Sequence, residues 1–178
     1  MTDQRCYLLT GRPRVGKSTV IKRVVERVGR ERCGGFYTEE IREHGERTGF
    51  RLFTLDGKSG LLAHEQIVRP FRIGRYGVDE TCLDALGVPA IADAVARQRL
   101  LIIDELGPME AYSTTFRQVV SDVLNSTIPF VGTIALASHP WLDTIKQHPR
   151  VIIRLMDANE REIVYEELTE FAQAVLTA

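Results

Sequence analysis

The sequence predicts a three-layer α/β sandwich in which helices cover both faces of a mostly parallel sheet. Short apolar runs alternate with segments whose apolar residues recur at helical spacing, which is the pattern of strand–helix–strand units. A glycine-rich turn joins the first expected strand to the first expected helix. Residues 36–55 alternate as a β-hairpin does, so the sheet should carry an inserted antiparallel part.

The glycine-rich turn has the spacing of a phosphate-binding loop. It reads Gly-Arg-Pro-Arg-Val-Gly-Lys-Ser, which fits the pattern Gly, any four residues, Gly-Lys-Ser/Thr. An apolar strand over residues 6–10 precedes it, and a helix that should end at Gly29 follows. Glycines allow backbone N–H groups to point at phosphate oxygens, and the helix N-terminus adds partial positive charge. The predicted nucleotide-binding residues of this loop are Gly11, Arg12, Pro13, Arg14, Val15, Gly16, Lys17, Ser18 and Thr19.

Two side chains of the loop have specific expected roles. Lys17 is predicted to bridge the terminal phosphates and is a candidate catalytic residue, and Ser18 Oγ is a candidate Mg²⁺ ligand. A nucleoside triphosphate is therefore the expected substrate and Mg²⁺ the expected cofactor. This combination of loop and sheet indicates the phosphate-loop NTPase class.

The predicted hairpin is rich in arginine. Its strands are expected over residues 33–42 and 50–55, and residues 61–64 and 67–69 are candidates for two further short strands. The arginines are either a solvated strand surface or a source of positive charge for the nucleotide phosphates, and both interpretations stay open. They are Arg42, Arg47, Arg51, Arg69, Arg72 and Arg75.

A second decisive stretch follows a helical region at residues 78–96, which Gly87 and Pro89 should divide in two. Four large aliphatic residues lead directly to Asp104 and Glu105, as expected for a central parallel strand. Acids at the carboxyl end of such a strand project into the crevice where ligands bind. Asp104 is therefore a candidate Mg²⁺ ligand, and Glu105 a candidate catalytic residue that orients and deprotonates a water.

Glu110 has two open interpretations, a second acid near the metal or a charge in the first turn of the next helix. That helix is expected over residues 113–124, and a buried strand over residues 130–135 should follow it. Ser138 is the expected N-cap of a short helix.

The C-terminal part of the chain should hold one more strand, residues 151–155, and a final helix capped by Asp157 or Asn159. The four histidines are scattered without metal-site spacing. No repeat, linker or change in composition divides the chain, so residues 1–178 are predicted to form a single phosphate-loop NTPase domain.

Composition limits the other function classes. The net charge is −1, with 44% hydrophobic and 26% charged residues, which argues against nucleic acid as a partner. No apolar run is long enough to span a membrane, so we expect no membrane partner. Three widely spaced cysteines and the absence of a signal peptide favour a cytoplasmic location, and a monomer is compatible with the sequence.

Five further stretches make a family resemblance visible: residues 35–42, 45–50, 62–63, 74–78 and, above all, 103–110, where Gly-Pro-Met-Glu follows the strand-end acids. With the phosphate loop, they make the chain similar to the THEP-type family of small nucleoside-triphosphatases, which includes a human cancer-related NTPase. The resemblance implies a RecA-like (ASCE) core and slow, Mg²⁺-dependent hydrolysis of ATP, GTP and other nucleoside triphosphates to diphosphate and phosphate.

The resemblance also implies a second set of nucleotide-binding residues around the strand-end acids. They are Leu101, Ile102, Ile103, Asp104, Glu105, Leu106, Gly107 and Pro108. One departure concerns the end of the last strand, where family members commonly carry an Asn-Arg pair. Here the residues are Asn159, Glu160 and Arg161, so the arginine is either displaced by one position or missing.

The leading function is therefore a nucleoside-triphosphate phosphohydrolase. Base selectivity should be low, because the chain has no Asn-Lys-x-Asp motif for reading guanine. Two alternatives use the same loop: a kinase that transfers the γ-phosphate to a nucleoside or nucleotide, and a nucleotide-dependent binding switch.

Overall fold

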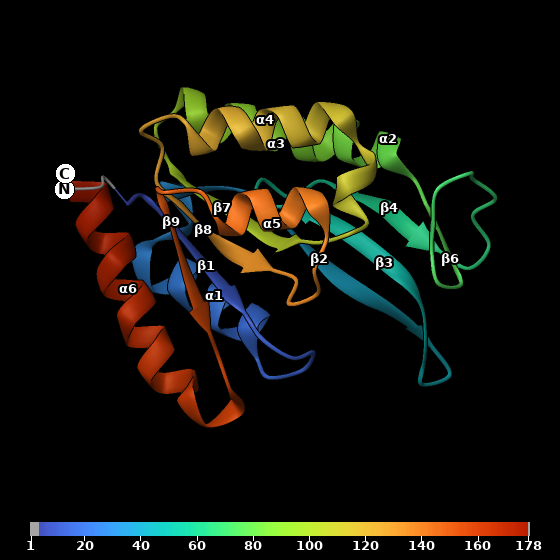
Figure 1. The fold of residues 1–178 in the computed structure, drawn as a ribbon, viewed down its shortest axis with the longest axis horizontal. Helices are drawn as coiled ribbons and strands as arrows, with labels where there is room; N and C mark the ends of the chain where they lie inside the picture. The colour runs from blue at the N-terminus through green and yellow to red at the C-terminus, as the bar shows by residue number, and fades with distance from the viewer. Residues whose placement is uncertain (1–3, 178) are drawn as a thin grey trace.

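The computed structural model describes residues 4–177 as one nine-stranded sheet with helices on both faces (Figure 1). The strands are β1 (Cys6–Thr10), β2 (Cys33–Glu43), β3 (Glu46–Thr54), β4 (Ser59–His64), β5 (Arg72–Ile73), β6 (Tyr76–Val78), β7 (Leu100–Leu106), β8 (Phe130–Ile134) and β9 (Val151–Leu155). The helices are α1 (Lys17–Val28), α2 (Glu80–Cys82), α3 (Val88–Ala96), α4 (Thr114–Leu124), α5 (Pro140–Lys146) and α6 (Arg161–Thr177). None of these helices is both long and apolar enough to cross a membrane.

The sheet has the order β5-β6-β4-β3-β2-β7-β8-β1-β9. The strands from β2 to β9 in this order run parallel, which confirms the predicted α/β sandwich. The other strands are antiparallel and extend the sheet beyond β2, so the inserted part is larger than a hairpin. Since β1, β8 and β7 are parallel, their carboxyl ends lie at one edge of the sheet.

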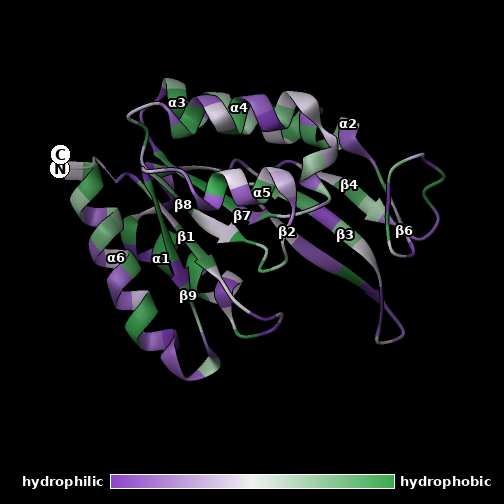
Figure 2. Ribbon diagram, viewed as in Figure 1, coloured by the Kyte–Doolittle hydropathy of each residue, from purple (hydrophilic) through white to green (hydrophobic). Residues whose placement is uncertain are grey.

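Alternate residues of β7 pack on opposite faces, as a strand covered on both sides requires. Leu101 and Ile103 join the apolar cluster beneath α3, α4 and α5, while Leu100 and Ile102 join the cluster beneath α1 and α6. Figure 2 shows that β2 and β3, in contrast, become hydrophilic toward the end where their hairpin turns. The core therefore fixes the parallel half of the sheet, and the hairpin projects from it.

Three local predictions were wrong. Residues 67–69 are not a strand; the chain pairs later, through β5 and β6. Residue 78 does not begin a helix, because β6 ends there and pairs with β4. The N-cap of α5 is His139 rather than Ser138: the His139 side chain accepts the N–H of Trp141, and the Ser138 hydroxyl bonds Asp143.

The helical region before β7 is divided differently from the prediction. A π-helical segment, Leu83–Gly87, joins α2 to α3, and Pro89 lies in the first turn of α3. Proline has no N–H to continue the α-helical pattern, and the wider π turn accommodates its ring. The predicted cap of the final helix is confirmed for Asp157, which forms a capping box with Glu160 ahead of α6.

Candidate active site

The phosphate-loop residues form the turn between β1 and α1. Gly16 has a φ of 101°, which an L side chain rarely adopts, and it leads directly into α1. The first turn of α1 has no acidic residue and no side-chain cap, so its N–H groups remain available to an anion. Lys17 is buried and donates from Nζ to the carbonyl oxygens of Gly11 at 3.0 Å and Arg12 at 3.1 Å. An ammonium has three donors, so one remains for a phosphate oxygen.

The acids at the end of β7 lie across one intervening strand from this loop. β8 separates β1 from β7, and its Thr133 hydroxyl donates to Asp104 Oδ1 at 2.5 Å. Thr38 on the other neighbour, β2, donates to the main-chain oxygen of Asp104 at 3.3 Å. The peptide bond between Asp104 and Glu105 is cis. Asp104 is thus held from both sides of its strand.

Burial dominates the electrostatics of both acids. The pKa of Asp104 is raised by its burial, while hydrogen bonds from Thr133 and Ser18 and the charge of Lys17 act to lower it. The contact with Ser18 places the start of α1 next to the end of β7. The pKa of Glu105 is also raised, first by burial and then by the charge of Asp104. A carboxylate with a raised pKa accepts a proton more readily than an exposed one.

One oxygen of Asp104 is available for a metal ion. Oδ2 is buried and has no hydrogen-bond partner among residues 4–177. A carboxylate oxygen and a serine hydroxyl at a helix N-terminus suit Mg²⁺, which is usually held by one or two protein ligands together with phosphates and waters. Within the described part of the chain, no three His, Cys, Asp or Glu side chains are grouped to hold a metal by themselves. The donor set therefore fits Mg²⁺ bound with a nucleotide.

Glu110 is buried behind these acids. Its Oε2 accepts the N–H of Gly107 at 3.0 Å, which closes the turn after β7. A Cβ on Gly107 would lie 3.0 Å from this oxygen and 3.2 Å from Glu105 Oε1, so both carboxyl groups flank the same glycine. Burial, followed by the charge of Glu105, raises the pKa of Glu110 to about 8. Glu110 lies in the short 3-10 turn Glu110–Tyr112, ahead of α4 and not in its first turn, while its role as a second acid near the metal stays a prediction.

The shifted arginine of the last strand also reaches the loop. Arg161 begins α6, and its Nε donates to the carbonyl oxygen of Val15 at 2.7 Å. A Cβ on Gly16 would lie 2.6 Å from the same nitrogen, so the guanidinium covers this glycine. Residues near the two ends of the chain therefore meet at the phosphate loop.

The other residues predicted to contact nucleotide differ in how deeply they are buried. Leu101, Ile102 and Ile103 are at most 1% exposed, so their side chains pack in the core and support Asp104 from within. Gly107 and Pro108 follow Glu105 at the edge of the sheet, and contact with nucleotide stays a prediction for them.

The arginines of the insert separate into two groups. Arg42, Arg47 and Arg75 line a cavity of about 510 Å³ together with Arg14 of the phosphate loop. The other members are directed elsewhere: for example, Arg69 pairs with Asp79 at 3.4 Å. Sequence spacing could not distinguish the two groups.

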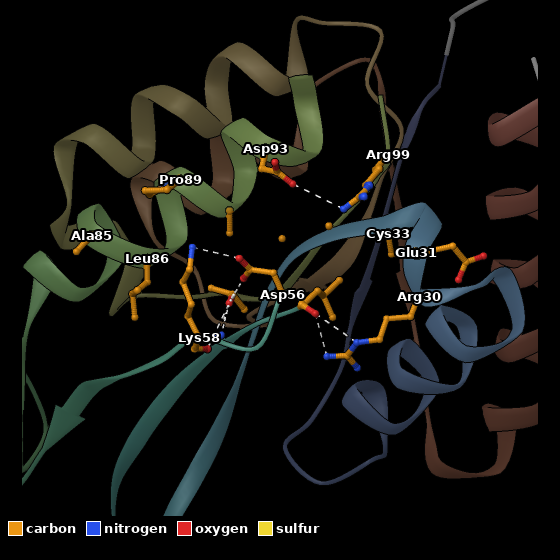
Figure 3. Close-up of a pocket in the computed structure, with 15 residues that line it drawn as sticks. Arg30, Glu31, Cys33, Asp56, Lys58, Ala85, Leu86, Pro89, Asp93 and Arg99 are labelled. Carbon is orange, nitrogen blue, oxygen red and sulfur yellow. Dashed lines mark hydrogen bonds and ion pairs between the residues drawn. The ribbon is translucent and has the colours of Figure 1, made fainter. Parts of the chain in front are cut away.

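Another cavity, of about 500 Å³, lies at the opposite end of the sheet (Figure 3). It opens beside the start of β2 and beneath α3, where Lys58 faces Asp56 and Arg99 faces Asp93. Arg30 and Glu31 also line it. Its lining contains no residue of the phosphate loop and neither acid of β7, so it is not part of the predicted site.

Two contacts of the site escaped the sequence analysis: the hydrogen bond of Thr133 with Asp104 and that of Arg161 with the loop. Thr133 stands one residue before the end of an ordinary buried strand, and only its pairing beside β7 gives its hydroxyl a target. No local spacing signals such a contact.

The chain is similar to known proteins over most of its length. A family model described as NTPase matches residues 6–169. The nucleoside-triphosphatase THEP1 of Thermotoga petrophila is 39% identical over 161 residues, which cover 90% of this chain and 89% of the relative. The protein of the same name from Methanothermobacter thermautotrophicus is 40% identical over 162 residues, covering 89% and 90%.

Two solved structures share the fold. The crystal structure of THEP1 from the hyperthermophile Aquifex aeolicus matches with a TM-score of 0.83 at 32% identity and covers 91% of this chain and 96% of its own. The solution structure of a human cancer-related nucleoside triphosphatase gives 0.81 at 31% identity, with 96% and 98% covered.

Proposed function

This chain belongs to the NTPase family, as the resemblance predicted, and we propose that it hydrolyses nucleoside triphosphates to diphosphate and phosphate with Mg²⁺. The proposed site lies between the phosphate loop and the carboxyl end of β7. The observation that carries the proposal is that Asp104 Oδ2, buried next to the start of α1, has no hydrogen-bond partner in residues 4–177.

The loop binds the triphosphate. Main-chain N–H groups of the loop, Pro13 excepted, and of the uncapped N-terminus of α1 donate to phosphate oxygens. The Lys17 ammonium adds a full positive charge and has one donor left for a phosphate oxygen. Arg161 holds the loop through Val15. Preorganised donors of this kind stabilise the charge that develops during phosphoryl transfer.

Ser18 and Asp104 would hold Mg²⁺, which when bound neutralises charge on the β- and γ-phosphates. Thr133 orients Asp104 for this role by occupying its other oxygen. Thr38 fixes the main chain at the same point.

Glu105 orients the attacking water and takes its proton. The water oxygen bonds to the γ-phosphorus, and the bond from that phosphorus to the β,γ-bridging oxygen breaks, which releases the diphosphate. The raised pKa of Glu105, caused first by burial, supports this assignment, because it strengthens the carboxylate as a base.

We further propose that base selectivity is low and that the protein acts in the cytoplasm. The chain lacks a guanine-reading Asn-Lys-x-Asp motif, which supports the first point. The three cysteines, Cys6, Cys33 and Cys82, are buried and free, which supports the second, since disulfides are rare in that compartment.

Phosphate release with Mg·ATP and Mg·GTP tests the proposal. The wild type should hydrolyse both, EDTA should abolish the activity, and Lys17→Ala should lower it at least about 100-fold. Glu105→Gln should bind nucleotide with nearly unchanged affinity but hydrolyse it about 100-fold more slowly. A wild-type rate of hydrolysis in Glu105→Gln would contradict the role of Glu105 as the base. Failure of the folded wild type to bind any Mg·nucleotide would contradict the proposed function.

A further inference from the structure

The cavity beside the phosphate loop is strongly basic. Its lining comprises Arg14, Arg42, Gly45, Glu46, Arg47, Arg75 and Tyr76, so four guanidinium groups stand against one carboxylate. The cavity in Figure 3 has nearly the same volume but carries three basic and three acidic side chains. The excess of positive charge therefore distinguishes the cavity that borders the loop from the cavity in Figure 3.

Tyr76 fixes two of these arginines. Its hydroxyl accepts Nε–H of Arg47 at 3.0 Å and Nε–H of Arg75 at 3.2 Å, and donates to the carbonyl oxygen of Arg47 at 3.1 Å. Both guanidinium groups also lie over the Tyr76 ring, at 5.5 and 5.4 Å from its centre. Tyr76 is only 6% exposed, so its position is fixed and it restrains both arginines. Arginines on a solvated strand surface would have no such restraint.

Two glutamates hold the arginines from outside the cavity. Glu40 pairs with Arg42 at 2.6 Å and with Arg47 at 3.0 Å, and Glu65 pairs with Arg75 at 2.9 Å. Neither glutamate belongs to the lining. The arginines keep further N–H groups, since Nη2 of Arg47 has no hydrogen bond within residues 4–177.

Arg14 is the fourth arginine of the cavity and the one that comes from the phosphate loop rather than from the insert. It belongs to the phosphate loop, is exposed, and makes no hydrogen bond or ion pair with the rest of the described chain. Like charges that converge on one cavity repel each other, and a bound anion offsets this repulsion. The planar guanidinium fork matches phosphate oxygens, and the cavity is large enough for a phosphate group with part of the molecule that carries it.

We propose that this cavity is a second anion site, which binds the phosphate group of another ligand while the loop holds the nucleotide. The proposal rests on the proposed function, because the position of Arg14 places the cavity beside the bound triphosphate. Two sources share this chemistry: the orthophosphate that hydrolysis produces, and a phosphomonoester of a second substrate.

The test is calorimetric titration of inorganic phosphate into the protein saturated with Mg·ADP. The wild type should take up one equivalent, and Arg47→Ala and Arg75→Ala should each weaken this binding about tenfold while ADP affinity changes less than about twofold. Arg97→Ala is the matched control, because it removes an exposed, ion-paired arginine from the far end of α3 and should leave phosphate binding unchanged. Tyr76→Phe keeps the ring and should also weaken phosphate binding.

The proposal is overturned if the wild-type ADP complex takes up no phosphate, or if both arginine variants bind it as well as Arg97→Ala does. Circular dichroism checks the fold of each variant, and Arg42→Ala replaces any that does not fold. In Lys17→Ala, phosphate should still bind at the cavity even if ADP does not, so failure of the second site and failure of the proposed function are distinguishable.

A parallel titration with glycerol 3-phosphate separates the two sources. Tighter binding of orthophosphate than of the ester assigns the cavity to the product of hydrolysis. Tighter binding of the ester assigns it to a second phosphorylated substrate, and in either case Arg47→Ala must reduce the affinity.

Discussion

The hydroxyl of Thr133 is hydrogen-bonded to Oδ1 of Asp104 at 2.5 Å, and neither residue is more than 3% exposed. The bond joins the ends of β8 and β7 at the edge of the sheet where the phosphate loop lies. It occupies one carboxylate oxygen while the other has no partner within residues 4–177. The orientation of the proposed metal ligand therefore depends on a residue of the neighbouring strand.

Thr133→Val should weaken the apparent affinity for Mg²⁺ several-fold, because Asp104 loses the donor that orients it. Leaving a buried carboxylate oxygen unpaired should also cost about 1–3 kcal/mol of unfolding free energy. The measurements are phosphate release against Mg²⁺ concentration and urea unfolding. Thr133→Ser keeps the hydroxyl and should resemble the wild type; equal Mg²⁺ dependence in Val and Ser variants would contradict the role of Thr133.

Glu110 should make stability depend on pH. Burial and the charge of Glu105 raise its pKa from the ordinary 4.5 to about 8, so the folded protein keeps a proton that the unfolded chain releases. This contribution is complete below about pH 4.5 and is lost as the pH rises to about 8, with a slope of up to about 1.4 kcal/mol per pH unit.

Glu110→Gln should flatten this decline, because the amide oxygen still accepts the Gly107 N–H but does not titrate. Urea unfolding at several pH values between about 5 and 8 measures how the unfolding free energy depends on pH. Glu26→Gln, at an exposed position on α1, is the control and should leave the slope unchanged. An identical slope in wild type and Glu110→Gln would show that the Glu110 carboxyl is ionised in the folded protein.

Arg161→Ala should weaken nucleotide binding about threefold to tenfold, because the carbonyl oxygen of Val15 loses its charged donor and the loop becomes less ordered. Stability should change by no more than about 0.5 kcal/mol, since the side chain is exposed. Fluorescent-nucleotide titration measures the affinity, with Arg97→Ala as control. If the two variants bind nucleotide equally well, Arg161 does not support the loop.

Phe116→Ala should destabilise the fold by about 3–5 kcal/mol. The ring is fully buried, with its centre 5.8 Å from that of Phe36 on β2 and 6.1 Å from that of Trp141 on α5. Urea unfolding gives the difference. Leu136→Ala, at a half-exposed position, should cost less than about 0.5 kcal/mol, and similar losses in both variants would contradict the position of Phe116 in the core.

The parts of the site that sequence could predict are those encoded by neighbours in the chain. The phosphate loop needs its glycines, Lys17 and Ser18 within one turn, and the β7 acids follow directly on an aliphatic run. The contact of Thr133 depends instead on strand order, and that of Arg161 on the approach of the start of α6 to the loop. Such contacts leave no periodic signal.

The errors in the fold have a similar origin. Residue 78 is predicted to begin a helix because the sequence after it is helical, but its pairing with β4 makes it the last residue of β6. Residues 67–69 have the composition of a strand without a partner to pair with. The secondary structure of both segments depends on strand pairing in the folded protein, which local propensity does not predict.

The position of β1 in the sheet determines when, during synthesis, neighbouring strands can stabilise the phosphate loop. The loop is complete once residue 18 has been made, yet β1 pairs only with β8 and β9, which follow more than a hundred residues later. Contacts so distant in the chain form late, as loop-closure entropy dictates. A ribosome-bound chain from which β9 has not yet emerged therefore carries the complete loop next to an unpaired β1, and nucleotide binding should wait until β8 and β9 have paired with it.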